Sequence, residues 1–181
     1  MRKFLTGAAL AVVVASVVAI GVAKAAAPGP DYLDAVSFTA VAKNANTATL
    51  SVTSKADIPR HPDAFISANP VVGFAWIDLA TARVFVVTIH PVIGRDSHQR
   101  PDGWHAHTAT LAGGATAPND LCIASIDSAP TAGISIHGET IKVNVQQSDL
   151  RLVPGAFDAA VGFTIQLDSG CSSGLAVRIS T

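Results

Sequence analysis

The sequence has few of the sulfur ligands that soft metal ions prefer. Its 181 residues include one Met, at position 1, and two Cys, Cys122 and Cys171, which form no C-x-x-C pair. Thioether and thiolate sulfur are the ligands that select copper(I). The absence of any internal Met therefore argues against a thioether-based copper(I) carrier.

Basic residues are also scarce, and they do not form a patch. Three of the 12 Lys and Arg residues, Arg2, Lys3 and Lys24, lie in the N-terminal segment, which leaves nine against 13 acidic residues, a net charge of −4. Proteins that bind nucleic acids carry clustered positive charge to neutralise phosphates. We therefore expect no nucleic-acid partner.

The N-terminal segment has the pattern of an export signal. Arg2 and Lys3 precede an apolar run from Phe4 to Ala23, and a small-x-small motif follows at Ala23–Ala25. A basic region, an apolar region and a small-residue cleavage site are typical of a signal peptide. We expect residues 1–25 to be removed and the mature protein to be periplasmic or extracellular, without a membrane anchor. An uncleaved anchor is the alternative, because about 20 apolar residues also span a bilayer.

Export makes a disulfide the expected state of the two cysteines. Cys122 and Cys171 are an even pair in a chain predicted to leave the reducing cytoplasm. Closing a loop of about 50 residues stabilises a fold by ~4 kcal/mol on the chain-entropy model. A pair of metal thiolates or a catalytic thiol is the alternative.

The rest of the chain lacks helical periodicity. No stretch of ten residues after the signal has a 3.6-residue apolar period, and only 147–160 has room for one helical turn. Short runs rich in Val, Ile, Thr and Phe are separated by turn residues instead, as in strands. They lie at 35–42, 47–54, 71–79, 83–90, 104–112, 121–127, 134–138, 140–147, 159–167 and 175–180.

This spacing predicts an all-β fold of about nine strands, an antiparallel β-sandwich or barrel. We expect a loose N-terminal lead over 26–34 and one domain over 35–181. The run Val84–Val87 is apolar on both faces, which predicts a central strand.

Four of the six histidines fall within 90–107. Residues two apart on a strand point to the same face, so His105 and His107 share one. His90 ends the preceding strand, and antiparallel pairing would place it beside His105. The sequence therefore predicts a site for zinc or copper(II), metals that imidazole ligates well.

The connection over 91–103 supplies the other polar residues of this region. His98 and Asp96 are the candidates for a fourth metal ligand. Asp96 and Asp102 are also candidates for the general base of a metal-dependent enzyme. A metal-free extracytoplasmic module that binds a small molecule or carbohydrate through this loop is the rival hypothesis, with Trp104, Arg100 and Asp102 as its contacts.

Other features are weaker. His61 lies in a Pro-rich loop, and His137, two residues before the single Glu of the chain, Glu139, is a weaker candidate for the cluster. The motif at 170–174 has the G-x-S-x-G spacing around Ser172, but no acid or His follows it, as a hydrolase elbow requires. We interpret this motif as a turn. Histidines that face solvent, or that are buried with their hydrogen bonds satisfied by the core, are the simplest alternative to a metal site.

The first prediction concerns processing. Exported protein should begin near Ala26 and contain the Cys122–Cys171 bond, because the signal is removed outside the reducing cytoplasm. Intact mass with and without reductant tests both statements. Two free thiols in exported protein would contradict the disulfide.

Overall fold

The computed structural model describes residues 30–60, 71–90, 103–150 and 152–180, and ten antiparallel strands make up most of these residues. The strands are β1 (Ala35–Ala42), β2 (Thr47–Ser54), β3 (Val72–Asp78), β4 (Arg83–Ile89), β5 (His105–Ala112), β6 (Leu121–Ser128), β7 (Ala132–His137), β8 (Thr140–Gln146), β9 (Ala159–Leu167) and β10 (Leu175–Ile179). The predicted all-β class is confirmed. The described residues form helical turns only at η1 (Asp31–Leu33), α2 (Gln147–Leu150) and η3 (Pro154–Ala156).

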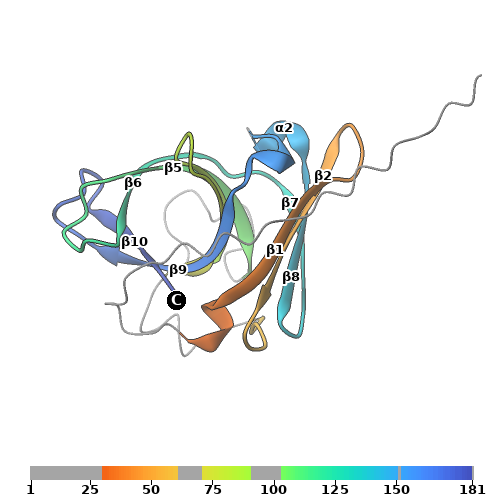
Figure 1. Cartoon of the computed structure of the whole chain (residues 1–181), viewed down its shortest axis with the longest axis horizontal. Helices are drawn as coiled ribbons and strands as arrows, with labels where there is room; N and C mark the ends of the chain where they lie inside the picture. Colours follow the sequence, from red (N-terminus) through yellow and green to blue (C-terminus); the bar gives the residue numbers. More distant parts are fainter. Residues whose placement is uncertain (1–29, 61–70, 91–102, 151, 181) are drawn as a thin grey trace, which may run out of the picture.

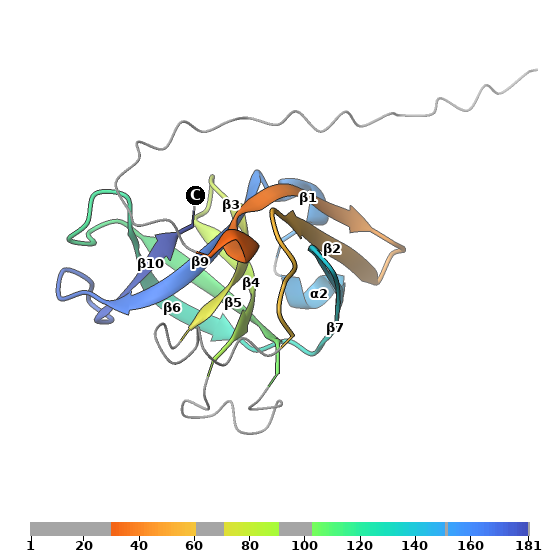
Figure 2. The ribbon, with the colours of Figure 1, turned by 90° about the horizontal axis from the view of Figure 1, so that it is seen from below.

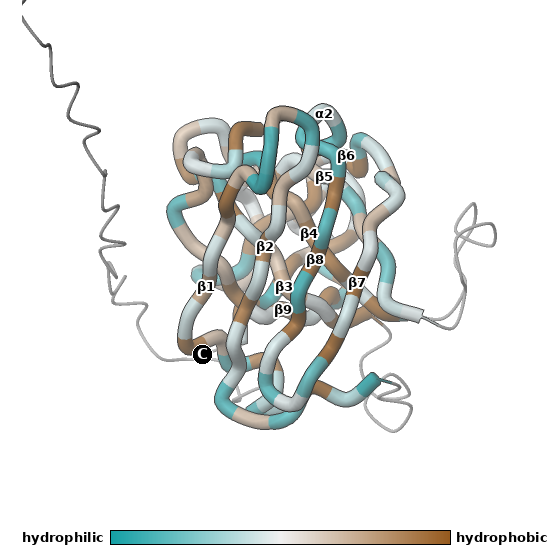
Figure 3. The backbone as a smooth tube through the Cα atoms, turned by 90° about the vertical axis from the view of Figure 1, so that its right-hand side faces the viewer, coloured by the Kyte–Doolittle hydropathy of each residue, from teal (hydrophilic) through white to brown (hydrophobic). Residues whose placement is uncertain are grey.

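The strands form two sheets of different kinds. Six of them close into a barrel in the order β10-β6-β5-β4-β3-β9, and β9 pairs with β10 to complete the ring. The other four form an open sheet in the order β1-β2-β8-β7. The open sheet stands against one side of the barrel (Figure 1), and its strands lie in front of β3, β4 and β9 when its outer face is viewed (Figure 3).

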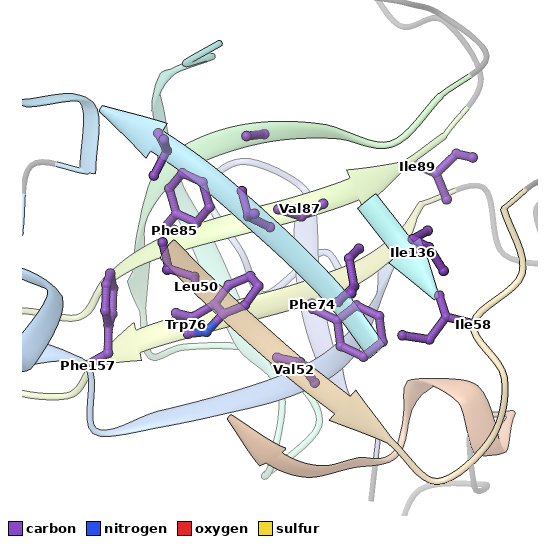
Figure 4. Packing of buried hydrophobic residues seen from close by; sticks show 14 of the residues in the cluster. Leu50, Val52, Ile58, Phe74, Trp76, Phe85, Val87, Ile89, Ile136 and Phe157 are labelled. Carbon is purple, nitrogen blue, oxygen red and sulfur yellow. The ribbon is translucent and has the colours of Figure 1, made fainter. Parts of the chain in front are cut away.

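The larger hydrophobic core fills the space between the open sheet and the barrel. Every second residue of β2 is buried, and its Leu50 and Val52 face Phe74 and Trp76 of β3 across this space (Figure 4). Phe85 and Val87 of β4 belong to the same cluster. The alternation along β2 is what a strand with one covered face requires.

The second core lies inside the barrel. The alternate residues of β3 and β4 line it, including Ala75, Ile77 and Val84, together with Ala109 and Phe163 from other strands. All seven residues of β3 are buried for this reason, since one face lies against the open sheet and the other against the barrel interior. The prediction that Val84–Val87 belongs to a central strand is confirmed, because β4 pairs with both β3 and β5.

The end of the predicted N-terminal lead is packed. The side chain of Leu33 in η1 is fully buried, and the Ser54 hydroxyl lies 2.6 Å from the carbonyl oxygen of Tyr32. η1 lies against β9 at Gly162 (Figure 2). A Cβ at Gly162 would be 1.8 Å from the Leu33 carbonyl oxygen, so only glycine allows this approach.

The predicted disulfide joins Cys122 of β6 to Cys171, in the connection from β9 to β10. Asp168 stabilises the connection from β9 to β10 through hydrogen bonds. Its carboxylate accepts hydrogen bonds from the hydroxyl and backbone N–H of Thr116 and from the backbone N–H of Gly170. The hydrogen bond from the Thr116 hydroxyl, followed by those from the backbone N–H groups, lowers the pKa of Asp168.

The second prediction follows from Asp168. A carboxylate with a lowered pKa in the folded state stabilises the fold above its unfolded-state pKa of ~4, and this contribution is lost as the pH falls through the lower folded value. Asp168→Asn should therefore reduce Tm by a few degrees at pH 7 and by progressively less below about pH 4. Thermal unfolding at both pH values measures this. The exposed Asp57→Asn variant is the control, and an equal loss at both pH values would contradict the assignment.

Candidate metal centre

His105 and His107 lie at the start of β5, and their side chains point into the barrel. The next residues on their face, Ala109 and Leu111, line the barrel interior, whereas Ala106 between them belongs to the core against the open sheet. The prediction that the two histidines share a face is confirmed. The sequence alternation on β5 therefore places two imidazoles above an apolar barrel interior.

His90 reaches the same place from β4. β4 and β5 pair so that Thr88 is opposite His105 and Val86 is opposite His107. His90 follows Thr88 by two residues, so it leaves β4 on the same face of the barrel wall, next to the start of β5. The expected approach of the end of one strand to the start of the next is confirmed.

The three imidazoles form one buried cluster. Each of them offers a ring nitrogen, and these nitrogens all lie within 4.8 Å of one another. His90, His105 and His107 are 7%, 6% and 8% exposed, values more typical of core residues than of loop histidines. The solvent-facing interpretation is therefore excluded for these three residues.

The ring of His105 is held in a defined orientation. Its Nδ1 lies 2.9 Å from the carbonyl oxygen of Gly103, and its Nε2 lies 2.9 Å from Nε2 of His90. A carbonyl can only accept, so Nδ1 of His105 carries a proton and donates it. In the neutral pair Nε2 of His105 is then the acceptor, and Nε2 of His90 donates to it.

This arrangement would suit His105 as a metal ligand. Histidine ligands of metals usually donate the second ring N–H to a backbone carbonyl or carboxylate, which fixes the tautomer and directs the other nitrogen to the ion. Gly103 supplies that carbonyl. The lone pair of His105 Nε2 therefore points toward His90, where a metal ion would replace the shared proton.

Two described neighbours of the cluster on β4 are apolar or already hydrogen-bonded. Val86 lies opposite His107, and the hydroxyl of Thr88 donates to the carbonyl of Val72 at 2.7 Å. Among the residues that the structure describes, only the three histidines meet as a group of possible metal ligands. A divalent ion held by neutral imidazoles in such a low-dielectric position attracts an anionic or polar fourth ligand strongly.

Several residues predicted for this region fall outside the described part of the chain. They are Asp96, His98, Arg100 and Asp102, together with His61. His137 is described, and it lies exposed at the end of β7, apart from the cluster.

Trp104 packs against the protein core, as one interpretation of the segment 102–105 expected. Its ring stacks on Phe74 with centroids 6.1 Å apart, and its indole N–H donates to the carbonyl of Pro59 at 3.3 Å. It also lines a shallow groove with Arg60 and His137. Arg60 was not predicted as a groove residue, because no sequence signal places residue 60 beside β5 and β7.

Comparisons of the chain with protein-family models, curated proteins and solved structures find no match. None of the described helices has the length and apolar character needed to cross a bilayer.

The third prediction concerns the tautomer of His105. In neutral, metal-free protein its ring should be protonated at Nδ1, because the Gly103 carbonyl accepts a hydrogen bond there. Long-range ¹H–¹⁵N correlation spectra of the imidazoles distinguish the two tautomers. A ring of His105 protonated only at Nε2 would contradict the orientation described above.

Proposed function

We propose that this protein binds a divalent transition metal, zinc or copper(II), through His90, His105 and His107. The observation that carries the proposal is the burial of three imidazoles whose ring nitrogens lie within 4.8 Å of one another. Metal–nitrogen bonds of ~2.0–2.1 Å place the nitrogens of one metal shell about 3–4 Å apart, and the three imidazoles lie close to this spacing.

The position of the three residues also supports a metal. Two of them stand on β5, and the third follows β4, whose pairing with β5 fixes the distance between the backbones. Sites built on strands hold their ligands more precisely than sites built on loops. Gly103 adds the orienting hydrogen bond to His105 that metal-bound histidines commonly have.

The fourth ligand comes from the segment between His90 and Gly103 in this proposal. Asp96 and His98 are its candidates, since both belong to the connection that leaves β4 at the cluster and returns to β5 there. A water molecule in this position would instead leave the metal open for chemistry on a small molecule, and Asp96 or Asp102 would then be the candidate base.

The compartment we propose is outside the cytoplasm. The disulfide between Cys122 and Cys171 is compatible with export, because such bonds persist in oxidising compartments. In the periplasm or outside the cell, a buried three-histidine site can store or sense a metal, or use it in catalysis.

A metal-free binding module is the second candidate, and the groove at Trp104 favours it. Arg60 offers a guanidinium there, although its Nη2 also donates to the carbonyl of Ile136 at 3.2 Å. A groove with an aromatic wall and a cation suits a sugar or a small anion. It leaves the buried histidines unexplained, which is why we favour the metal site.

The fourth prediction tests the ligand set. His90→Ala, His105→Ala and His107→Ala should each weaken binding of zinc or copper(II) at least about 100-fold, because each removes one ligand from a shared shell. Double variants should add little to the single losses. Titration calorimetry of metal-free protein measures the affinities, and circular dichroism verifies that each variant is folded.

The matched control for these variants is His137→Ala, which removes an exposed imidazole from β7. It should leave the affinity unchanged, and so should His61→Ala. Asp96→Asn and His98→Ala identify which residue supplies the fourth ligand. Unchanged affinity in all three cluster variants would disprove the metal site.

A further inference from the structure

We propose that the cluster is arranged for a tetragonal metal ion, copper(II), rather than for tetrahedral zinc. This inference rests on the proposed metal-binding function and concerns which ion the site fits. In the arrangement we propose, His90 and His107 lie on opposite sides of the metal and His105 lies at right angles to both.

The positions of the three rings carry the argument. The ring centroids of His90 and His105 are 4.6 Å apart, those of His105 and His107 are 4.9 Å apart, and those of His90 and His107 are 6.2 Å apart. The triangle they form is closer to right-angled at His105 than to equilateral. His105 is also the ring that stands nearly perpendicular to the other two, at 77° and 79°.

These distances distinguish the two coordination geometries. With a metal–nitrogen bond of ~2.0–2.1 Å, an imidazole centroid lies about 3.1–3.2 Å from the metal. Rings at right angles then have centroids about 4.5 Å apart, opposed rings about 6.3 Å apart, and every tetrahedral pair about 5.2 Å apart. The two shorter centroid distances, His90 to His105 and His105 to His107, match pairs of ligands at right angles. The longer distance, His90 to His107, matches a pair of opposed ligands.

The distance between two of the ring nitrogens fits the same geometry as the ring centroids. Nε2 of His90 and Nε2 of His105 are 2.9 Å apart. The hydrogen bond between them holds the two nitrogens at the separation of about 2.9 Å that a right-angle pair also requires, whereas a tetrahedral pair requires about 3.3–3.4 Å. A tetrahedral ion would therefore have to separate these two nitrogens while drawing His90 and His107 together.

The packing resists such a rearrangement. His105 is tied to the Gly103 carbonyl, and the backbones of β4 and β5 are fixed by their pairing. All three rings are buried, so a ring can move only if its neighbours move as well. The site therefore favours the ion whose geometry it already has.

The available ligands also favour copper(II) over copper(I). Both cysteines form the disulfide, and the only Met is residue 1, so no soft sulfur ligand is available for copper(I). Imidazole nitrogens in a tetragonal arrangement are typical of copper(II) or nickel(II) sites.

Affinity alone cannot test this inference, because copper(II) binds most nitrogen sites more tightly than zinc does. Electron paramagnetic resonance of full-length protein loaded with one equivalent of copper(II) reports the geometry directly. We expect an axial spectrum with a large parallel copper hyperfine splitting and superhyperfine lines from three equatorial nitrogens. His107→Ala should reduce the nitrogen count to two, and His137→Ala should leave the spectrum unchanged.

Two failures of this experiment are distinguishable. A spectrum with the small parallel splitting of a flattened tetrahedron, lost on substitution of the cluster histidines, would overturn the tetragonal geometry and leave the metal site intact. Protein that binds zinc through the cluster but not copper(II) would do the same. Protein that binds neither ion would overturn the proposed function itself.

Discussion

The closed hydrogen-bond ladder of the six-stranded barrel is the constraint on which the rest of the structure depends. Closure fixes the pairing of β4 with β5, and that pairing places Thr88 opposite His105 and Val86 opposite His107. A shift of one residue would turn every side chain of β5 to the other face and move both histidines into the core against the open sheet. The cluster therefore exists only in this register.

The same closure forces β3 and β4 to serve two cores. Their outward residues, such as Trp76 and Phe85, pack against the open sheet, and their inward residues, such as Ile77 and Val84, fill the barrel. Apolar packing on both sides restricts the movement of these strands. His90 directly follows β4, so its backbone position is restricted as well. Ligands on such a support would be preorganised, which would reduce the entropic cost of binding the proposed ion.

Much of the fold could be predicted from local patterns. The bounds of β1, β2 and β9 were predicted to the residue, because turn residues such as those at 43–46 interrupt a clear alternation. Proximity of His90 to His105 was also predictable, since a strand end and the next strand start meet in an antiparallel pair. The closure of one sheet was not, because the pairings of β9 with β3 and of β10 with β6 join segments far apart in the sequence.

The sequence by itself determined the strands, the shared face of His105 and His107, and the pair of cysteines that forms the disulfide. These features depend on the two-residue period of a strand and on composition, which are local. Only the tertiary structure decided that this shared face is the interior of a barrel, and that the three imidazoles are buried with His105 nearly perpendicular to the other two. Burial and ring orientation depend on contacts with β3, β4 and the Gly103 carbonyl, and no period in the sequence records which partners a closed sheet will bring together.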